Sequence, residues 1–221
     1  MHLRCKKGAY EHIDNSELCV MDPYPWKGRW DELFGNGNPL HLEIGSGKGS
    51  FVTKCAALHP DVNYVAVEVY ASPMYRAILK AEKTGCTNLR FLRMTAEFLP
   101  RVFAEGEVSR IYLNFSDPWP RKGDWNKRFT SPHYLNLYRS FLKPEGRVEF
   151  KTDNVPFFDV SLKTAAENGW TASETTYDLH HDGNPDWNVM SDFETDYVSR
   201  GVPICRTVFT MSGTVNATED K

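Results

Sequence analysis

The sequence predicts an α/β fold built on a mainly parallel sheet of seven strands, with helices on both faces of the sheet. From Leu40 onward, short apolar runs typical of buried strands alternate with helical stretches of about a dozen residues. This alternation is the pattern of right-handed βαβ units. The chain has 221 residues, of which 41% are hydrophobic and 25% are charged. It is therefore long and apolar enough to bury the core of one globular domain.

The expected elements follow one another in a regular order. Strands are predicted over residues 40–45, 62–68, 88–94, 108–115, 146–153, 171–179 and 203–210. Helices are predicted over residues 50–60, 72–85, 95–103, 131–142 and 155–168. In the second of these helices we expect Ser72 as the N-cap, Pro73 at the first position and Gly85 as the stop.

Three parts are expected along the chain. Residues 1–38 form an N-terminal extension that ends in the turn signal FGNGNP, residues 39–210 form the α/β domain, and residues 211–221 form a disordered polar tail. The five cysteines are scattered, which favours reduced thiols in the cytoplasm. No apolar run approaches the roughly 20 residues of a membrane span. The net charge of −3 does not by itself indicate a nucleic-acid partner.

A glycine-rich loop follows the first predicted strand. In LEIGSGKGS, Gly45, Gly47 and Gly49 have the spacing G-x-G-x-G, which differs from the dinucleotide fingerprint and from the P-loop. Glu43 precedes the loop, where a carboxylate would repel a pyrophosphate and favour a cation such as the amine or sulfonium of S-adenosylmethionine. Glu68 ends the next strand, where an acid can accept hydrogen bonds from two ribose hydroxyls. We expect a nucleoside-type cofactor here, with a purely structural turn as the alternative.

A second unusual stretch, SDPWP, ends the fourth predicted strand. Ligands of parallel sheets bind beyond the carboxyl ends of the strands, so Asp117 is expected near the glycine loop. Pro118 and Pro120 restrict the backbone, and Trp119 offers a face for stacking a base. The stretch resembles the D/N-P-P-Y/F corner of methyltransferases that act on base nitrogens. The alternative is a simple turn with a surface tryptophan.

Four motifs in order give the chain a resemblance to a known family. HLEIGSGKG, YLNFSDPWP, FKTDN and PICR resemble the bacterial tRNA (guanine-N7)-methyltransferases, over roughly Leu3 to Phe209. The resemblance implies a Rossmann-like class I methyltransferase that uses S-adenosylmethionine and methylates a guanine in the variable loop of tRNA. We accordingly expect tRNA as the partner, no metal and no membrane, and a cytoplasmic monomer or homodimer.

The resemblance, together with the glycine loop, also implies roles for individual residues. The catalytic residue is Asp117. Cofactor contacts are expected from Glu43, Gly45, Gly47, Glu68, Thr95 and Asp117. Substrate contacts are expected from Arg121, Asp153, Ser191, Asp192, Phe193 and Glu194. Contacts with RNA are expected from Gly123, Asp124, Trp125, Asn126, Lys127 and Arg128.

Two positions depart from the pattern of that family. The family usually has Asp or Asn at position 95, whereas Thr95 supplies one neutral hydroxyl, so we expect weaker cofactor binding. The family's basic run usually reads KKRHxKRR, whereas RKGDWNKR is diluted in charge. Arg4, Lys6 and Lys7 in the N-terminal extension, with Arg121, Lys122, Lys127 and Arg128, are expected to follow the phosphate backbone, although a solvated charged face would have the same composition.

The chemistry of the target atom defines what the site must supply. Guanine N7 has an in-plane lone pair and no proton, so its attack on a methyl group needs alignment rather than a general base. We expect Asp117 to hold the guanine through N1–H and the exocyclic amine and to favour the developing cation, with Asp153 as a candidate to share this role. From local sequence, Asp153 is equally suited to cap the following helix.

Other functions remain open at this stage. A methyltransferase of an exocyclic amine would share the corner, and a tRNA-binding scaffold without turnover would share the fold. A nicotinamide dehydrogenase is disfavoured by the glycine spacing and by Glu43. His180 and His181 suit a loop better than a metal site.

Overall fold

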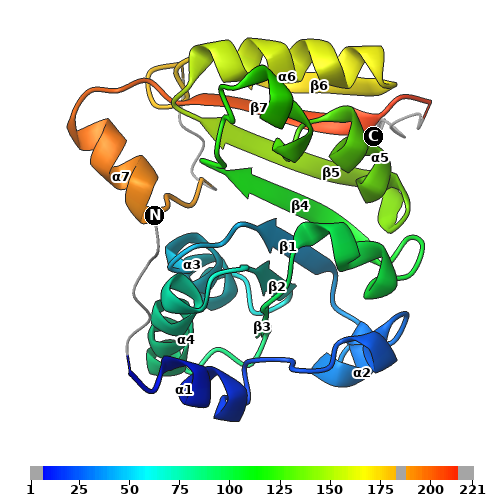
Figure 1. Cartoon of the computed structure of the whole chain (residues 1–221), viewed down its shortest axis with the longest axis vertical. Coiled ribbons are helices and arrows are strands. Elements are labelled where there is room, and N and C mark those ends of the chain that lie inside the picture. The colour runs from blue at the N-terminus through cyan, green and yellow to red at the C-terminus, as the bar shows by residue number, and fades with distance from the viewer. Residues whose placement is uncertain (1–6, 183–187, 214–221) are drawn as a thin grey trace, which may run out of the picture.

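A seven-stranded sheet forms the centre of the structure, a computed structural model that describes residues 7–182 and 188–213 (Figure 1). The strands lie in the order β3-β2-β1-β4-β5-β7-β6. Strand β7 runs antiparallel to β5 and β6, and the other neighbouring pairs are parallel. The mainly parallel seven-stranded sheet predicted from the sequence is therefore confirmed.

The bounds of the elements are as follows. The strands are β1 (Leu40–Ile44), β2 (Asn63–Val67), β3 (Leu89–Leu92), β4 (Val108–Asn114), β5 (Leu142–Thr152), β6 (Trp170–Thr176) and β7 (Cys205–Met211). The α-helices are α1 (Ala9–Asn15), α2 (Trp30–Phe34), α3 (Ser50–Leu58), α4 (Ala71–Thr84), α5 (Pro132–Arg139), α6 (Val155–Glu167) and α7 (Asp192–Ser199). The 3₁₀-helices are η1 (Tyr24–Trp26), η2 (Ala96–Arg101) and η3 (Lys122–Lys127).

Several boundary predictions are wrong. Strand β5 begins at Leu142 rather than at Gly146, β6 ends at Thr176 rather than at Leu179, and the helix predicted over residues 95–103 is the shorter η2. Helix α4 begins at Ala71, because the N–H of Met74 already bonds to the carbonyl of Tyr70, so Ser72 lies inside the first turn and is not the cap. Gly85 does end this helix, with φ of 67°. The helix predicted to reach Leu142 ends at Arg139, because Leu142 pairs with Val108 in the sheet.

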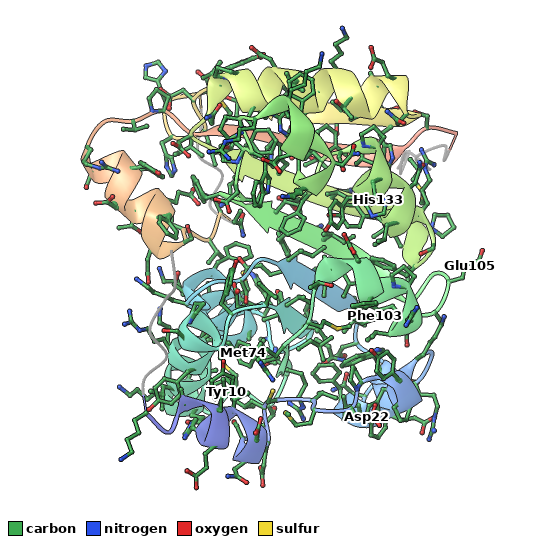
Figure 2. The ribbon with its side chains drawn as sticks, in the orientation of Figure 1. Tyr10, Asp22, Met74, Phe103, Glu105 and His133 are labelled. Atoms are coloured by element: carbon green, nitrogen blue, oxygen red, sulfur yellow. The ribbon has the colours of Figure 1, made fainter. Side chains whose placement is uncertain are left out.

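Successive residues of each strand point to opposite faces of the sheet, and their side chains pack into one hydrophobic core on each face. On one face, α3 and α4 cover a core that includes Phe51, Val52, Tyr64, Ala66, Met74, Ile78, Phe91 and Tyr112. On the other face, α5 and α6 cover a core that includes Leu42, Ile44, Val65, Ile111, Tyr134, Tyr138, Phe150 and Phe158. Figure 2 shows Met74 on α4 within the first of these cores. The predicted placement of helices on both faces is confirmed.

The described part of the N-terminal segment packs on this domain. Helix α1 lies against α4, and the backbone of Leu18 and Val20 bonds to Phe91 of β3. Trp30 is buried, its indole N–H donates to the carbonyl of Val102 at 3.0 Å, and its ring stacks on Phe103 at 5.1 Å. Residues 7–38 therefore share the core of the domain, and the idea that this segment faces RNA stays a prediction.

The expected polar tail begins inside β7 at Met211, and residues 214–221 lie outside the described residues. Within residues 7–182 and 188–213, no helix is long and apolar enough to cross a membrane.

Candidate active site

The glycine loop connects β1 to α3 by a turn that only glycine adopts easily. Gly45, Gly47 and Gly49 have φ of 77°, 54° and 67°, a region that side chains disfavour. A Cβ on Gly49 would lie 2.6 Å from the Cβ of Ala77, so this glycine also allows α3 to pack against α4. The N–H groups of Gly45 and Ser46 bond to the carbonyl of Val67 at 2.9 and 3.1 Å, which ties the loop to the end of β2.

Glu68, directly after β2, holds the loop from the other side. Its carboxylate accepts the N–H of Gly47 at 3.0 Å and the N–H of Tyr70 at 2.8 Å. Burial raises the pKa of Glu68, against the effect of these backbone donors. Each carboxylate oxygen has a further lone pair, so Glu68 can hold the loop and still accept from hydroxyl groups.

Glu43 is a buried acid in β1 with an incomplete set of partners. Its side chain is 3% exposed, and the amide of Asn114 donates to Oε1 at 3.0 Å. Oε2 has no hydrogen-bond partner among the described residues. Burial raises the pKa of Glu43 to about 7, opposed by the Asn114 bond, by the charge of Lys151 and by the nearby backbone N–H of Val52. Such a group costs stability unless a ligand completes it.

Other incompletely bonded polar atoms lie at the same edge of the sheet. Within the described part of the chain, Ser46 Oγ, Asn114 Oδ1 and Ser116 Oγ are buried without a partner. These residues follow or end β1 and β4, which are neighbours in the sheet. The ends of β1 and β4 therefore present several acceptors and hydroxyls that protein groups leave unused.

The corner after β4 has a strained backbone. Phe115 and Trp119 have φ of 52° and 40°, values that cost bulky residues about 1–3 kcal/mol each. Asp117 lies between them and is exposed. The N–H of Phe115 bonds to the carbonyl of Lys151 at 2.9 Å, which fixes the start of the corner to β5.

The segment after the corner divides into an exposed part and a buried end. Its exposed members are Arg121, Lys122, Gly123, Trp125, Asn126 and Lys127, while Asp124 is half-buried and pairs with Lys127 at 2.7 Å. Arg128 is only 9% exposed. Its Nε donates to the carbonyl of Pro118 at 2.7 Å and its Nη2 to that of Trp119 at 3.2 Å. Arg128 thus faces inward, unlike the other members of the segment expected to contact RNA.

Asp153, directly after β5, lies beside helix α7. It accepts a hydrogen bond from the hydroxyl of Tyr197, whose pKa is raised by burial and by this carboxylate. The ring of Tyr197 lies 5.7 Å from that of Phe115 in the corner. The cap of α6 is Asn154, whose side chain accepts the N–H of Phe157 at 2.9 Å. The alternative that Asp153 caps this helix is therefore wrong.

The four residues Ser191–Glu194, expected to contact substrate, begin helix α7 with different exposures. Ser191 is buried and caps the helix by accepting the N–H of Glu194. Asp192 is exposed and pairs with Lys80 at 3.2 Å. Phe193 is 61% exposed, whereas Glu194 is 0% exposed.

Glu194 belongs to a buried polar cluster that the sequence did not predict. It pairs with Lys151 at 2.6 Å and His180 at 3.0 Å, and it accepts from the amide of Asn188 at 2.9 Å. Lys151 is itself 4% exposed. The cluster could have been predicted from the position of Lys151 in the strand FKTD. A lysine inside a buried strand almost always has a charged partner.

Five of the predicted site residues therefore lie on the same side of the sheet, each at or just beyond the carboxyl end of a parallel strand. They are Glu43, Glu68, Thr95, Asp117 and Asp153. Thr95 is exposed between β3 and η2, at the N-cap position of η2, and its side chain makes no capping bond. The predicted convergence of these residues is the arrangement in which α/β folds bind ligands.

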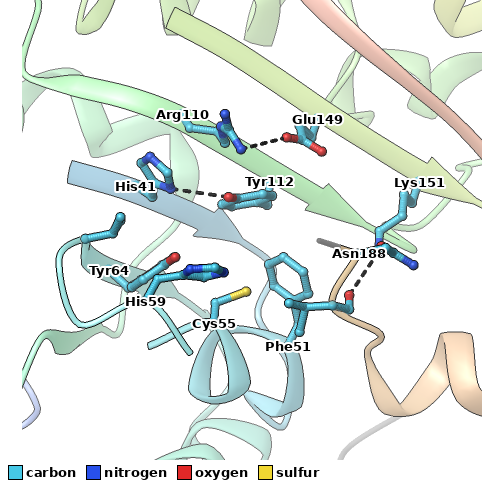
Figure 3. Close-up of a pocket in the computed structure, with 12 residues that line it drawn as sticks. His41, Phe51, Cys55, His59, Tyr64, Arg110, Tyr112, Glu149, Lys151 and Asn188 are labelled. Atoms are coloured by element: carbon cyan, nitrogen blue, oxygen red, sulfur yellow. Dashed lines mark hydrogen bonds and ion pairs between the residues drawn. The ribbon is translucent and has the colours of Figure 1, made fainter. Parts of the chain in front are cut away.

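A separate pocket of about 220 Å³ lies between α3 and the sheet (Figure 3). Its charged lining groups are paired with one another or with neighbours, since Arg110 pairs with Glu149 at 3.1 Å and Lys151 with Glu194. The hydroxyl of Tyr112 lies 3.2 Å from Nδ1 of His41. Neither the glycine loop nor Asp117 lines this pocket.

No group of three or more His, Cys, Asp or Glu side chains in the described ranges is arranged to hold a metal ion. His180, considered above for such a site, is engaged by Glu194. Arg4 and Lys6, expected to follow the phosphate backbone, lie outside the described residues, and Lys7 is exposed.

Comparison with known sequences shows close relatives along nearly the whole chain. Residues 37–207 match the protein family described as "Putative methyltransferase". A tRNA (guanine-N(7)-)-methyltransferase of Lachnoclostridium phytofermentans is 46% identical, over 94% of this chain and 97% of the relative. The enzyme of the same name from Bacillus subtilis is 38% identical, over 93% of this chain and 97% of the relative.

Comparison with solved structures supports the fold. The 16S rRNA methyltransferase KamB has a TM-score of 0.61 and 20% identity, over 84% of this chain and 93% of that chain. TrmN from Thermus thermophilus has a TM-score of 0.54 and 24% identity, over 82% of this chain and 46% of that chain. At these identities the likeness concerns the fold alone, and it confirms the predicted Rossmann-like methyltransferase architecture.

Proposed function

Because this chain belongs to the family of tRNA (guanine-N(7)-)-methyltransferases, we propose that it transfers a methyl group from S-adenosylmethionine to N7 of a guanine in the variable loop of tRNA. The observation that carries the proposal is the contact between β1 and β4, where Asn114 of the corner strand donates to Glu43 at 3.0 Å. This contact brings the glycine loop and the DPWP corner to adjacent strand ends.

The residues at the ends of β1, β2 and β3 suit S-adenosylmethionine. Glu43 offers a buried carboxylate with an oxygen unpartnered among the described residues, which a cationic group would complete. Glu68 keeps acceptor capacity for ribose hydroxyls, and the glycine loop exposes backbone where a side chain would intrude. Thr95 offers one hydroxyl beyond β3, and Asp117 borders the site from β4. When bound, the cofactor supplies an electrophilic methyl group on a sulfonium.

The residues at the ends of β4 and β5 suit a guanine. Guanine N7 carries its own lone pair, so the protein needs to orient the base and to stabilise positive charge rather than to remove a proton. Asp117 is exposed and can accept from N1–H and the exocyclic amine of the base. Trp119 offers a ring for stacking. Asp153 directly follows the neighbouring strand β5, where it can share the same role.

The exposed cations after the corner suit the phosphate backbone of tRNA. Arg121, Lys122 and Lys127 are exposed on the segment that follows Asp117. We expect tRNA affinity to fall steeply as salt rises, because each phosphate contact releases counterions. An affinity that hardly changes between low and physiological salt would show that these residues are not phosphate contacts.

The proposed function is tested by methyl transfer from labelled S-adenosylmethionine to unmodified tRNA, followed by digestion and chromatography of the nucleosides. We expect the label in 7-methylguanosine and its loss when a transcript carries 7-deazaguanine at the target, because only N7 is removed. Label that persists in the 7-deazaguanine transcript would indicate an exocyclic amine. Bound tRNA without any label would indicate a scaffold and overturn the proposal.

A further inference from the structure

Arg128 closes the segment after the corner back onto the corner itself. Its Nε and Nη2 donate to the carbonyls of Pro118 and Trp119, ten and nine residues earlier in the chain. Its guanidinium carbon lies 5.0 Å from the ring centroid of Trp125 and 5.4 Å from that of Phe157. A charged donor that is buried, doubly bonded and in contact with two aromatic rings is held firmly in one geometry.

The peptide that Arg128 holds is one that needs support. Trp119 has φ of 40°, which is a costly conformation for a bulky side chain. Strained backbone persists only where the surroundings hold it in place, and such strain is concentrated at functional sites. Arg128 bonds to the carbonyl of Trp119 itself and to the carbonyl before it. These two bonds fix the orientation of the two peptide groups on either side of Trp119, which begin one and two residues after Asp117.

The corner is therefore fixed at both ends. At its start, the N–H of Phe115 is bonded to β5 at the carbonyl of Lys151. At its far end, Arg128 is the anchor. Asp117 lies between the two anchors, so the direction of its exposed carboxylate depends on both.

We propose that Arg128 is a positioning residue for methyl transfer, which sets the geometry of Asp117 and Trp119 by holding the Pro118 and Trp119 carbonyls, and that it does not contact tRNA phosphate. The inference rests on the proposed function for its substrate. Within one segment, the exposed Lys122 then faces the RNA while Arg128 faces the corner.

The test compares Arg128→Lys with Lys122→Gln in steady-state methyl transfer to tRNA at several salt concentrations. Lysine keeps the charge but cannot reproduce two fixed N–H bonds. For Arg128→Lys we expect kcat to fall about 10- to 100-fold, since small misplacements of catalytic groups are costly, with the KM for tRNA within about twofold of the wild type. For the exposed Lys122→Gln we expect the reverse, namely a raised KM, a salt slope reduced by about one, and an unchanged kcat.

Three further measurements distinguish a positioning role of Arg128 from a loss of folding. Cofactor affinity by calorimetry shows whether Arg128→Lys is folded, and added guanidinium, but not ammonium, should restore kcat in Arg128→Ala. In the wild-type protein, side-chain NMR should show that the Arg128 Nε–H exchanges more slowly with water than that of an exposed arginine such as Arg121, and this needs no variant.

The outcomes separate the inference from the function on which it rests. A raised KM and a lowered salt slope in Arg128→Lys, with kcat retained, would make Arg128 a phosphate contact and overturn the inference. Fast exchange of its Nε–H would overturn it too. If the wild type labels another nucleoside, the proposed function fails, while the kcat of Arg128→Lys still decides the role of Arg128.

Discussion

The two sides of the candidate active site differ in how they hold buried charge. On the cofactor side, Glu43 is buried with an oxygen that no described residue satisfies, and burial raises its pKa to about 7. On the substrate side, Arg128, Lys151 and Glu194 are equally buried, but each is bonded to two or more protein groups. We infer that, within this site, the incompletely bonded oxygen of Glu43 is where a ligand binds, whereas the fully bonded Arg128, Lys151 and Glu194 position the residues around them. Each of the following changes tests one side of this comparison.

The largest effect is expected from Lys151→Met on the substrate side. Glu194 would then be a fully buried carboxylate without its cation, which typically costs about 3–5 kcal/mol of unfolding free energy. Urea denaturation measures this loss, and the double variant Lys151→Met/Glu194→Gln should recover part of it. The matched control is Lys163→Met, in an exposed pair with Glu167, with an expected change of less than about 1 kcal/mol. If Lys151→Met and Lys163→Met lowered the unfolding free energy by the same amount, the buried pair would contribute no more to stability than the exposed pair.

The next effect is expected from Asp117→Asn, in the corner between the two sides. The amide keeps the size of the side chain but loses the negative charge and half of its acceptors. We expect kcat for tRNA methylation to fall on the order of 10²-fold, with stability unchanged because Asp117 is exposed. The exposed Asp61→Asn serves as the control. Near-normal turnover with unaltered affinities for cofactor and tRNA would mean that Asp117 has no part in the reaction.

Glu43→Gln should separate stability from binding on the cofactor side. The folded pKa of about 7 lies above the ordinary value of 4.5, so between these pH values the folded protein holds a proton that the unfolded chain has lost. Stability contributed by this proton is therefore lost as pH rises from about 5 to about 8. At pH 8 the glutamine variant should be more stable than the wild type by on the order of 1–3 kcal/mol, with little difference at pH 5.

Binding should change in the opposite direction. Calorimetry should show weaker S-adenosylmethionine binding to Glu43→Gln at pH 8, together with loss of the proton release that accompanies binding to the wild type near pH 6.5. If Glu43→Gln were less stable than the wild type at pH 8, or bound the cofactor as well as the wild type, Glu43 would have a structural role and not a role in binding the cofactor.

The smallest effect is expected from Thr95→Asn. The threonine offers one exposed hydroxyl beyond β3, whereas the amide adds a further donor and acceptor. One additional hydrogen bond of about 1 kcal/mol corresponds to a gain of roughly fivefold in cofactor affinity. Calorimetry at fixed pH measures this gain, and Thr87→Asn, in the turn before β3, is the control. Lower affinity in Thr95→Asn would show that the hydroxyl is better suited to its site than the amide.

The same contrast explains how far the sequence could predict the structure. The positions of Glu43, the three glycines and Glu68 could be predicted from the sequence, because all of them lie near the carboxyl end of β1 or β2, while their contacts with a cofactor stay a prediction. The parallel sheet followed from the same alternation. On the substrate side, Arg128 and Glu194 were expected to contact RNA or substrate, but in the structure their side chains are bonded to other residues of the protein. Those partners, Pro118 and Lys151, are placed by contacts between distant parts of the chain, which periodicity does not describe.

Helices α1, α2 and α7 were missed for a related reason. They are short, and at five to eight residues they carry too little periodicity to be distinguished from loops. Their stability comes from docking, as shown by Trp30 of α2 on Phe103 and by Glu194 of α7 on Lys151.

The pairing of Leu18 and Val20 with Phe91 has a consequence for how separate copies of this protein behave. Strand β3 is the last strand on its side of the sheet, and an unpaired edge is a template on which other chains can add. The backbone of this short stretch takes up the N–H and carbonyl of Phe91, at 2.7 and 3.0 Å. At the opposite edge, β6 carries mostly exposed polar side chains and a register irregularity, which also discourage pairing. Each edge strand is thus protected against pairing with other chains. At β3 this protection comes from residues 18–20, which have no predicted part in methyl transfer.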